Sequence, residues 1–249
     1  MAGAAPATQL DSYRETWRSK PVLRALYADY YRRMVKLLKP GKTLELGAGS
    51  GHLRAHSPAN STGAVLTDIQ PAAWLDAAAD AQALPFRDGC FDNIILLDVL
   101  HHVENPALFF AEAARVLKPG GRVVMLEPAI TPLSGLFYRH FHPEPVNMHQ
   151  DPFADVPASP ARDPYDANQA IPTLLFRRHR AAFGHHFPSF HVARVRNLSL
   201  FAFPLSGGFR RWSLMPAFLV RPLLMLEDGL LMLLGPAMAF RLLVMLERR

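Results

Sequence analysis

Residues Thr43–Leu53 read T-L-E-L-G-A-G-S-G-H-L and decide the fold of this chain. The apolar residues at 43–46 predict a short buried strand in which Glu45 is the only charge. Three glycines follow, at 47, 49 and 51. Glycine adopts positive φ easily and lets a ligand approach the backbone, so a glycine-rich turn between a strand and a helix is typical of α/β proteins that hold a nucleotide. The spacing G-x-G-x-G is not the dinucleotide pattern G-x-G-x-x-G, and a tight turn that binds nothing is the alternative.

Strand and helix signals alternate along the chain after this turn. Apolar runs that end in acidic residues are typical of buried parallel strands, and Asn105-Pro106 is a helix start. The run Lys118-Pro119-Gly120-Gly121 ends that helix. This alternation predicts an α/β fold with a doubly wound, mostly parallel sheet. We predict strands at 43–46, 64–68, 91–98 and 122–127, and a helix over 106–117.

Asp68 stands at the end of the second predicted strand. A carboxylate in that place can accept two hydrogen bonds from ribose hydroxyls. The alternative is that Asp68 only caps a turn.

Two helices are expected before the glycine turn, over Leu10–Trp17 and Val22–Leu38. Apolar residues at 3–4 spacing give the second helix one apolar face, and arginines and a lysine make the rest basic. We expect residues 1–42 to pack as basic helices on the main domain, residues 43–249. A helix lying on a membrane is the alternative.

Composition bounds the class of protein. The chain has 249 residues, half of them apolar, which suits one sizeable α/β domain. The single cysteine, Cys90, excludes an intramolecular disulfide and fits a reducing, cytoplasmic compartment. We expect neither a signal peptide nor a transmembrane helix, because no charged start precedes an apolar core and no run of about 18 uncharged apolar residues occurs.

The net charge of +6 is unevenly distributed. Residues 1–42 carry +6, residues 43–171 carry −8 and residues 172–249 carry +8. Basic flanks suggest an anionic partner such as a membrane surface, a nucleic acid or a phosphorylated substrate, or simply a solvated surface.

Five motifs in order resemble one family. L-E-L-G-A-G-S-G is followed by Asp68, by D-A-x-x-L-P-F from residue 80, by F-D-x-I-x-x-x-D-V-L-H-H-V from residue 91 and by R-V-L-K-P-G-G-R from residue 115. Together they resemble the class I S-adenosylmethionine-dependent methyltransferases, and within them the type 11 branch that acts on small molecules and lipids. The resemblance covers residues 40–128 and implies a Rossmann-like sheet of seven strands.

The resemblance also implies roles in binding S-adenosyl-L-methionine. The glycine loop would pass beside the methionine part, with Glu45 orienting the loop and reaching the ammonium. Asp68 would hold the ribose, Ile69 would pack on the adenine, and Asp80 and the Ala81 amide would bind the adenine edge. The Leu97–Asp98 backbone would take the ammonium. The full set is Glu45, Gly47, Ala48, Gly49, Gly51, Asp68, Ile69, Asp80, Ala81, Leu97 and Asp98.

One stretch departs from the family pattern. Twelve positions separate Asp68 from Asp80, too few for a crossover helix and a strand. We therefore predict a shortened sheet edge with a brief strand near Leu75–Ala79 and an open adenine side beside Asp80.

The methyl acceptor needs a base if it is a weakly acidic oxygen. His101 and His102 follow Asp98 directly and are the candidate catalytic residues, unless the pair is only a structural lip. The proline-rich segment 128–171 is predicted to form an acceptor loop or lid. Its histidines, spaced two and then seven, match no zinc pattern, and we predict no metal site. Further base candidates are Glu127, Tyr138, His142 and His149.

The C-terminal part predicts two more strands and an insertion. Residues 171–183 are predicted to form a helix after the proline-rich segment. Residues 190–197 alternate as a strand does, and 240–246 would form the antiparallel strand that the family inserts beside the fifth. Between them, 206–239 is an apolar helical insertion with Trp212 beside two arginines. It would contact a membrane, cap the acceptor pocket, or bind a second copy or a partner subunit.

These observations predict a methyltransferase that uses S-adenosylmethionine on a hydrophobic or lipid-linked small molecule, at oxygen, at the inner membrane face. Two alternatives stay open. One is a nucleic-acid methyltransferase, disfavoured because basic and aromatic residues are not interleaved. The other is a subunit that binds the cofactor without catalysis.

Overall fold

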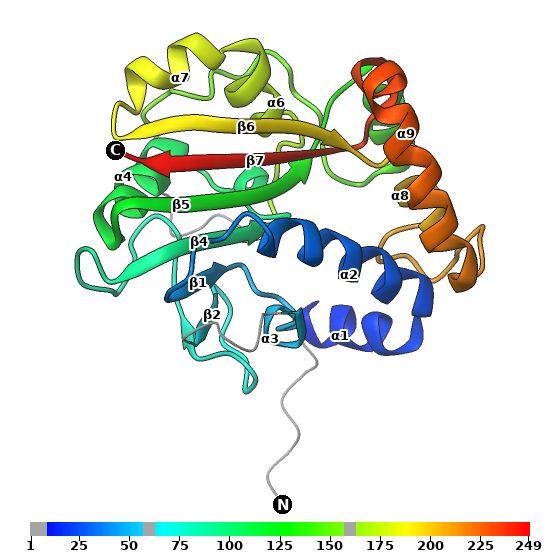
Figure 1. Cartoon of the computed structure of the whole chain (residues 1–249), viewed down its shortest axis with the longest axis horizontal. Coiled ribbons are helices and arrows are strands. Elements are labelled where there is room, and N and C mark those ends of the chain that lie inside the picture. The colour runs from blue at the N-terminus through cyan, green and yellow to red at the C-terminus, as the bar shows by residue number, and fades with distance from the viewer. Residues whose placement is uncertain (1–8, 57–62, 157–162) are drawn as a thin grey trace, which may run out of the picture.

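The structure is a computed structural model that describes residues 9–56, 63–156 and 163–249 (Figure 1). Its centre is a seven-stranded sheet in the order β3-β2-β1-β4-β5-β7-β6. All neighbouring strands are parallel except β7, which runs antiparallel to β5 and β6. The predicted fold class is confirmed. The strands are β1 (Thr43–Leu46), β2 (Ala64–Asp68), β3 (Ala77–Ala78), β4 (Phe91–Leu97), β5 (Leu117–Pro128), β6 (Phe190–Leu198) and β7 (Arg241–Arg248).

Helices cover both faces of this sheet. Alternate residues of a strand point to opposite faces, so Ile94 of β4 packs in one hydrophobic cluster and Ile95 in the other. The first cluster includes α4 and the helical segments from α6 to α7, and the second includes α1, α2, α5, α8 and α9. The α-helices are α1 (Gln9–Ser19), α2 (Pro21–Val35), α3 (Leu53–His56), α4 (Pro106–Val116), α5 (Pro132–Phe141), α6 (Ile171–Thr173), α7 (Arg180–His186), α8 (Ala202–Ser206) and α9 (Val220–Met238).

The shortened edge predicted between Asp68 and Asp80 is present. Strand β3 has two residues and pairs in parallel with β2, Thr67 opposite Ala77. The backbone N–H of Asp76 donates to the carbonyl of Leu66 at 2.8 Å, so the chain returns to the sheet without a crossover helix.

Three segments differ from the sequence-based expectation. The predicted loop at 128–171 contains helix α5, in which Thr131 and Ser134 form a capping box and Pro132 occupies the first turn. The helix expected over 171–183 is divided by a π-helical turn, η2 (Leu174–Arg178). The segment after the glycine turn contains the short helix α3. Residues 57–62 of that segment and residues 157–162 of the proline-rich segment lie outside the described residues.

The apolar insertion is tied to the N-terminal helices. The Lys20 ammonium donates to the carbonyls of Gly208, Arg210 and Trp212 at 2.6, 2.7 and 2.8 Å. Arg33 of α2 pairs with Asp228 of α9 at 2.7 Å. Residues 206–239 therefore pack on α2 and form part of the body of the protein. As predicted, β7 follows the insertion and lies beside β5.

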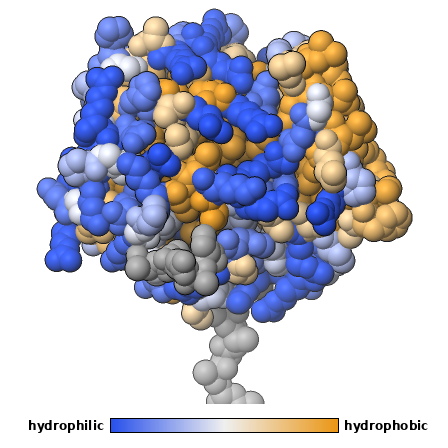
Figure 2. Space-filling model, in the orientation of Figure 1, coloured by the Kyte–Doolittle hydropathy of each residue, from blue (hydrophilic) through white to orange (hydrophobic). Residues whose placement is uncertain are grey.

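Part of the insertion nevertheless presents apolar side chains to solvent. Figure 2 shows hydrophobic residues gathered along the edge where α9 lies. Among the described residues, no helix is both long and apolar enough to cross a membrane. The apolar platform comprises Leu136 and Phe141 of α5, Phe218 of the 3-10 turn η3 (Ala217–Leu219), and Met225, Leu226, Met232 and Leu233 of α9, which are 56 to 93% exposed.

Candidate active site

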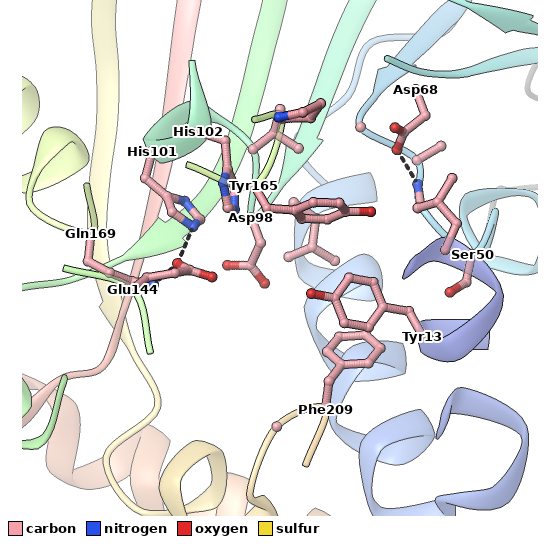
Figure 3. A pocket seen from close by; sticks show the side chains of 18 of the residues that line it. Tyr13, Ser50, Asp68, Asp98, His101, His102, Glu144, Tyr165, Gln169 and Phe209 are labelled. Atoms are coloured by element: carbon pink, nitrogen blue, oxygen red, sulfur yellow. Dashed lines mark hydrogen bonds and ion pairs between the residues drawn. The ribbon is translucent and has the colours of Figure 1, made fainter. Parts of the chain in front are cut away.

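A cavity of about 700 Å³ lies at the carboxyl ends of β1, β2 and β4. Carboxyl ends of parallel strands are where open α/β sheets bind ligands. In Figure 3, Asp68 and Ser50 occupy one end of the cavity, and His101, Glu144 and Gln169 the other. Asp98 and Tyr165 lie between the two ends.

The glycine turn forms one wall with its backbone. Gly47 has φ +60°, and a Cβ there would lie 2.3 Å from a methyl group of Val99, so only glycine fits. The N–H of Gly49 donates to Asp68 Oδ2 at 3.0 Å, and the Trp74 indole donates to the Gly49 carbonyl at 2.8 Å. Gly51 lies beside Trp74 and, unlike Gly47, Ala48 and Gly49, does not line the cavity.

Asp68 lines the cavity at the end of β2, as predicted. It is 8% exposed, and its second oxygen accepts the N–H of Gln70 at 3.1 Å. Burial raises the pKa of its carboxyl, against the lowering effect of the backbone donors. The carboxylate is thus fixed between the turn and the strand end, in the position proposed for ribose binding.

Glu45 lies behind the glycine turn and does not line the cavity. It is 1% exposed and accepts the Tyr31 hydroxyl at 2.8 Å, while Oε2 has no hydrogen-bond partner among the described residues. Burial, opposed by the Tyr31 hydrogen bond, raises its pKa to about 8. Glu45 is therefore buried against α2, and its roles in orienting the loop and reaching the cofactor ammonium stay predictions.

The remaining predicted cofactor residues line the cavity: Ile69, Asp80, Ala81, Leu97 and Asp98. Ile69 is 48% exposed, in keeping with an open adenine side. Asp98 has φ +61°, accepts the Tyr27 hydroxyl at 3.1 Å and forms an ion pair with the buried Arg241.

These residues fit S-adenosyl-L-methionine. A backbone cradle that excludes a side chain at Gly47 lies next to a fixed carboxylate at Asp68, and the cavity beyond them carries further acidic groups. A cofactor with a positive sulfur and ammonium suits such surroundings. When bound, it would supply an activated methyl group.

His101 is held between two carboxylates at the far end. Its Nδ1 lies 2.7 Å from Glu127 Oε2 and its Nε2 3.3 Å from Glu144 Oε2. Burial lowers the pKa of His101, but the hydrogen bonds to both carboxylates outweigh burial and raise it to about 10. Burial lowers the pKa of His102 to about 4. At neutral pH, therefore, His101 is protonated and His102 is uncharged, so His102 is the histidine able to accept a proton.

The other base candidates have different surroundings. Tyr138 lines the cavity, but its hydroxyl donates to the carbonyl of Phe240 at 2.8 Å. Glu127 is fully buried behind His101, where Oε1 accepts the N–H groups of Val99 and Leu100. His142 lines the cavity and His149 does not.

Several lining residues were missed by the sequence analysis. Tyr13 contacts Phe209 and Tyr165 with ring centroids 4.9 and 6.2 Å away, which gives the cavity an aromatic side. Glu144 and Gln169 complete the histidine end. These residues come from four segments far apart in the chain, and no local motif marks any of them.

Comparisons with known proteins find methyltransferases similar to this chain. Residues 44–125 match the family described as "Methyltransferase domain". A demethylmenaquinone methyltransferase of Tropheryma whipplei is 31% identical over 164 residues, which cover 55% of this chain and 66% of that protein. A ubiquinone/menaquinone biosynthesis C-methyltransferase UbiE of Acidiphilium cryptum is 37% identical over 107 residues, 36% of this chain and 43% of that protein. The matches thus span about two thirds or less of these relatives.

Solved structures share the fold. The geranyl diphosphate C-methyltransferase of Streptomyces coelicolor A3(2), solved with Mg²⁺, geranyl diphosphate and S-adenosyl-L-homocysteine, superposes with a TM-score of 0.53 at 12% identity over 99% of this chain and 88% of that one. An S-adenosylmethionine-dependent methyltransferase of Archaeoglobus fulgidus gives 0.53 at 13% identity over 95% and 98%. The motifs, the fold and the family match agree, and the chain carries a methyltransferase domain of the class I S-adenosylmethionine-dependent family.

Proposed function

We propose that this protein transfers a methyl group from S-adenosyl-L-methionine to a hydrophobic or lipid-linked small molecule. The observation that carries the proposal is the single cavity, which joins the Asp68 and glycine-turn end to the His101 and His102 end. Methyl transfer is an in-line displacement, so donor and acceptor must share one enclosed space.

The cavity walls favour an apolar ring or chain as the acceptor. Tyr13, Tyr165 and Phe209 supply aromatic surface between the two ends. The relatives named demethylmenaquinone methyltransferase and ubiquinone/menaquinone C-methyltransferase support a quinol-like acceptor. Such a molecule offers a hydroxyl to the histidine end and an apolar body to the aromatic side.

Both oxygen and carbon are possible methyl acceptors in such a ring. Removal of the hydroxyl proton increases the electron density on the oxygen and on the neighbouring ring carbon, so the same basic group serves either reaction. The sequence predicts transfer to oxygen, whereas the relative named a C-methyltransferase supports transfer to carbon. His102 would receive the proton, and the ion pair of Asp98 with Arg241 would fix the wall between the two ends.

We further propose that the apolar platform on α5 and α9 rests on the inner face of a membrane. Its side chains are exposed, and Arg210, Arg211 and Trp212 are exposed in the same insertion. Apolar and aromatic residues next to arginines suit the headgroup boundary of an anionic bilayer. A lipid-linked acceptor would reach the cavity from there.

A transfer assay tests the proposed activity. Full-length protein is incubated with methyl-labelled cofactor and a demethylated naphthoquinol in detergent, and mass spectrometry locates the methyl group. We expect labelled product with wild type and a loss of about a hundredfold or more with His102→Gln, the lower end of the range for one acid–base group. Cofactor binding without transfer to naphthoquinols, benzoquinols or prenyl diphosphates would favour the non-catalytic subunit. Transfer to nucleic acid instead would contradict the proposed substrate class.

A further inference from the structure

The histidine end of the cavity contains three potential metal ligands. His101, His102 and Glu144 each offer one ligand atom, and these three atoms lie within 4.8 Å of one another. Among the described residues, no other three histidine, cysteine or acidic side chains come together in this way. It is distinct from the histidines at 140, 142 and 149 that the sequence analysis considered. His101 and His102 belong to the 3-10 turn η1 (Leu100–His102), and Glu144 follows α5.

Second partners orient both rings. Glu127 Oε2 binds His101 Nδ1 at 2.7 Å, which directs Nε2 toward Glu144 at 3.3 Å. His102 Nδ1 lies 3.3 Å from the carbonyl oxygen of Asp166, which leaves Nε2 available. Metal-binding histidines commonly hold a carboxylate or a carbonyl oxygen with the other ring nitrogen, because this fixes the tautomer and the ring orientation.

A buried polar atom nearby is unsatisfied. Gln169 is 2% exposed and lines the cavity next to Glu144, to which its amide group donates. Its Oε1 has no hydrogen-bond partner among the described residues. A buried carbonyl oxygen without a partner is costly, and it points to a group that the protein alone does not supply.

We propose that His101, His102 and Glu144 bind a divalent transition-metal ion, such as Zn²⁺ or Co²⁺, with open coordination positions facing the cavity. Two imidazoles and one carboxylate favour such ions over Mg²⁺, which prefers oxygen ligands. Ligands on bonds of about 2.1 Å lie about 3 to 3.5 Å apart, so the side chains must draw together by roughly 1 Å. The ion replaces the proton between His101 Nε2 and Glu144, which leaves to solvent.

If the proposed function holds, the open positions give the ion a place in methyl transfer. With the ion bound, His102 is a ligand through Nε2 and no longer the base. An acceptor hydroxyl bound to the ion would then lose its proton to solvent more easily, because the ion stabilises the oxyanion. Metal binding itself does not depend on that function, and its test uses no methyl acceptor.

The test titrates chelator-treated full-length protein with Co²⁺, followed by its visible absorption, and with Zn²⁺ by calorimetry. We expect one ion per chain and no competition by Mg²⁺. His102→Ala and Glu144→Gln should each bind the ion at least about tenfold more weakly. Loss of a hydrogen-bond partner of a ligand already weakens metal affinity by that factor, and loss of the ligand itself should cost no less. His149→Ala, outside the cavity, is the matched control and keeps wild-type affinity. Calorimetry with S-adenosylmethionine checks that each variant is folded.

Absence of a bound ion in the wild type overturns the proposal. So does an ion that Glu144→Gln binds as tightly as the wild type, because Glu144 would then not be a ligand. Neither result bears on methyl transfer, which the assay with labelled cofactor tests separately.

Discussion

Gly47 and Gly89 share nearly the same backbone conformation, with φ +60° and +58°, but differ in their surroundings. A Cβ at Gly47 would meet Val99 at 2.3 Å, whereas a Cβ at Gly89 would meet nothing within 4 Å. Alanine at either position costs about 1–2 kcal/mol for its left-handed conformation. We expect Gly47→Ala to lose about 1–3 kcal/mol more, from overpacking. Equal losses in urea unfolding would contradict this close fit.

Glu45 makes stability depend on pH. With a folded-state pKa of about 8 against 4.5 for the free side chain, the folded protein holds a proton that the unfolded chain has lost between these values. The contribution of Glu45 to the free energy of unfolding therefore falls as pH rises from 4.5 to 8, by up to about 1.4 kcal/mol per pH unit. Glu45→Gln removes this slope, and the exposed Glu15→Gln keeps it. Parallel curves for Glu45→Gln and wild type would show that Glu45 is ionised in the fold.

At the residue scale, the sequence could locate the cofactor end of the site but not the acceptor end. Asp68 and the glycines are adjacent to a strand end, and local position alone determines what they face. Glu144, Gln169, Tyr13 and Phe209 reach the cavity only through tertiary packing. Nothing in their local sequence distinguishes them from surface residues.

Among the elements, the central parallel strands were the most predictable. Apolar runs with acidic ends determine β2 and β4, and only the exact bounds differ. Helix α5 was missed because prolines dominated the interpretation of residues 128–171, although Pro132 and the Thr131 cap are helix-start signals. Short helices such as α3 depend on packing and carry too few residues for a periodic pattern.

Helix α9 carries the prediction about membranes. Met225, Met232 and Leu233 are exposed, so replacing all three with glutamate should leave the core intact and weaken membrane contact. In flotation with anionic liposomes, we expect wild type to float and the triple variant to stay at the bottom. The control is Leu108→Glu, because Leu108 is exposed on α4, which packs on the other face of the sheet. This variant should float as the wild type does. Equal flotation of all variants would exclude the platform as the contact.

At the scale of the whole molecule, the N-terminal helices and the apolar insertion lie on the same face of the sheet. Helices α1 and α2 hold the insertion through Lys20 and Arg33, and α2 places Tyr27 and Tyr31 on Asp98 and Glu45. The N-terminal helices thus brace both the cavity and the apolar insertion. The sequence predicted that they pack on the domain, but the partners lie up to 195 residues apart, beyond what a local pattern can identify.

Cofactor binding by Asp68 is the claim on which the account depends. Calorimetry with S-adenosylmethionine should show one site in the wild type and, for Asp68→Ala, affinity lower by more than about tenfold, since hydrogen bonds to a charged group contribute roughly 1.5–3 kcal/mol. Asp88→Ala, at a carboxylate that is 80% exposed, should bind as the wild type does. Unchanged affinity in Asp68→Ala, or no binding by the wild type, would contradict the assignment of the cavity.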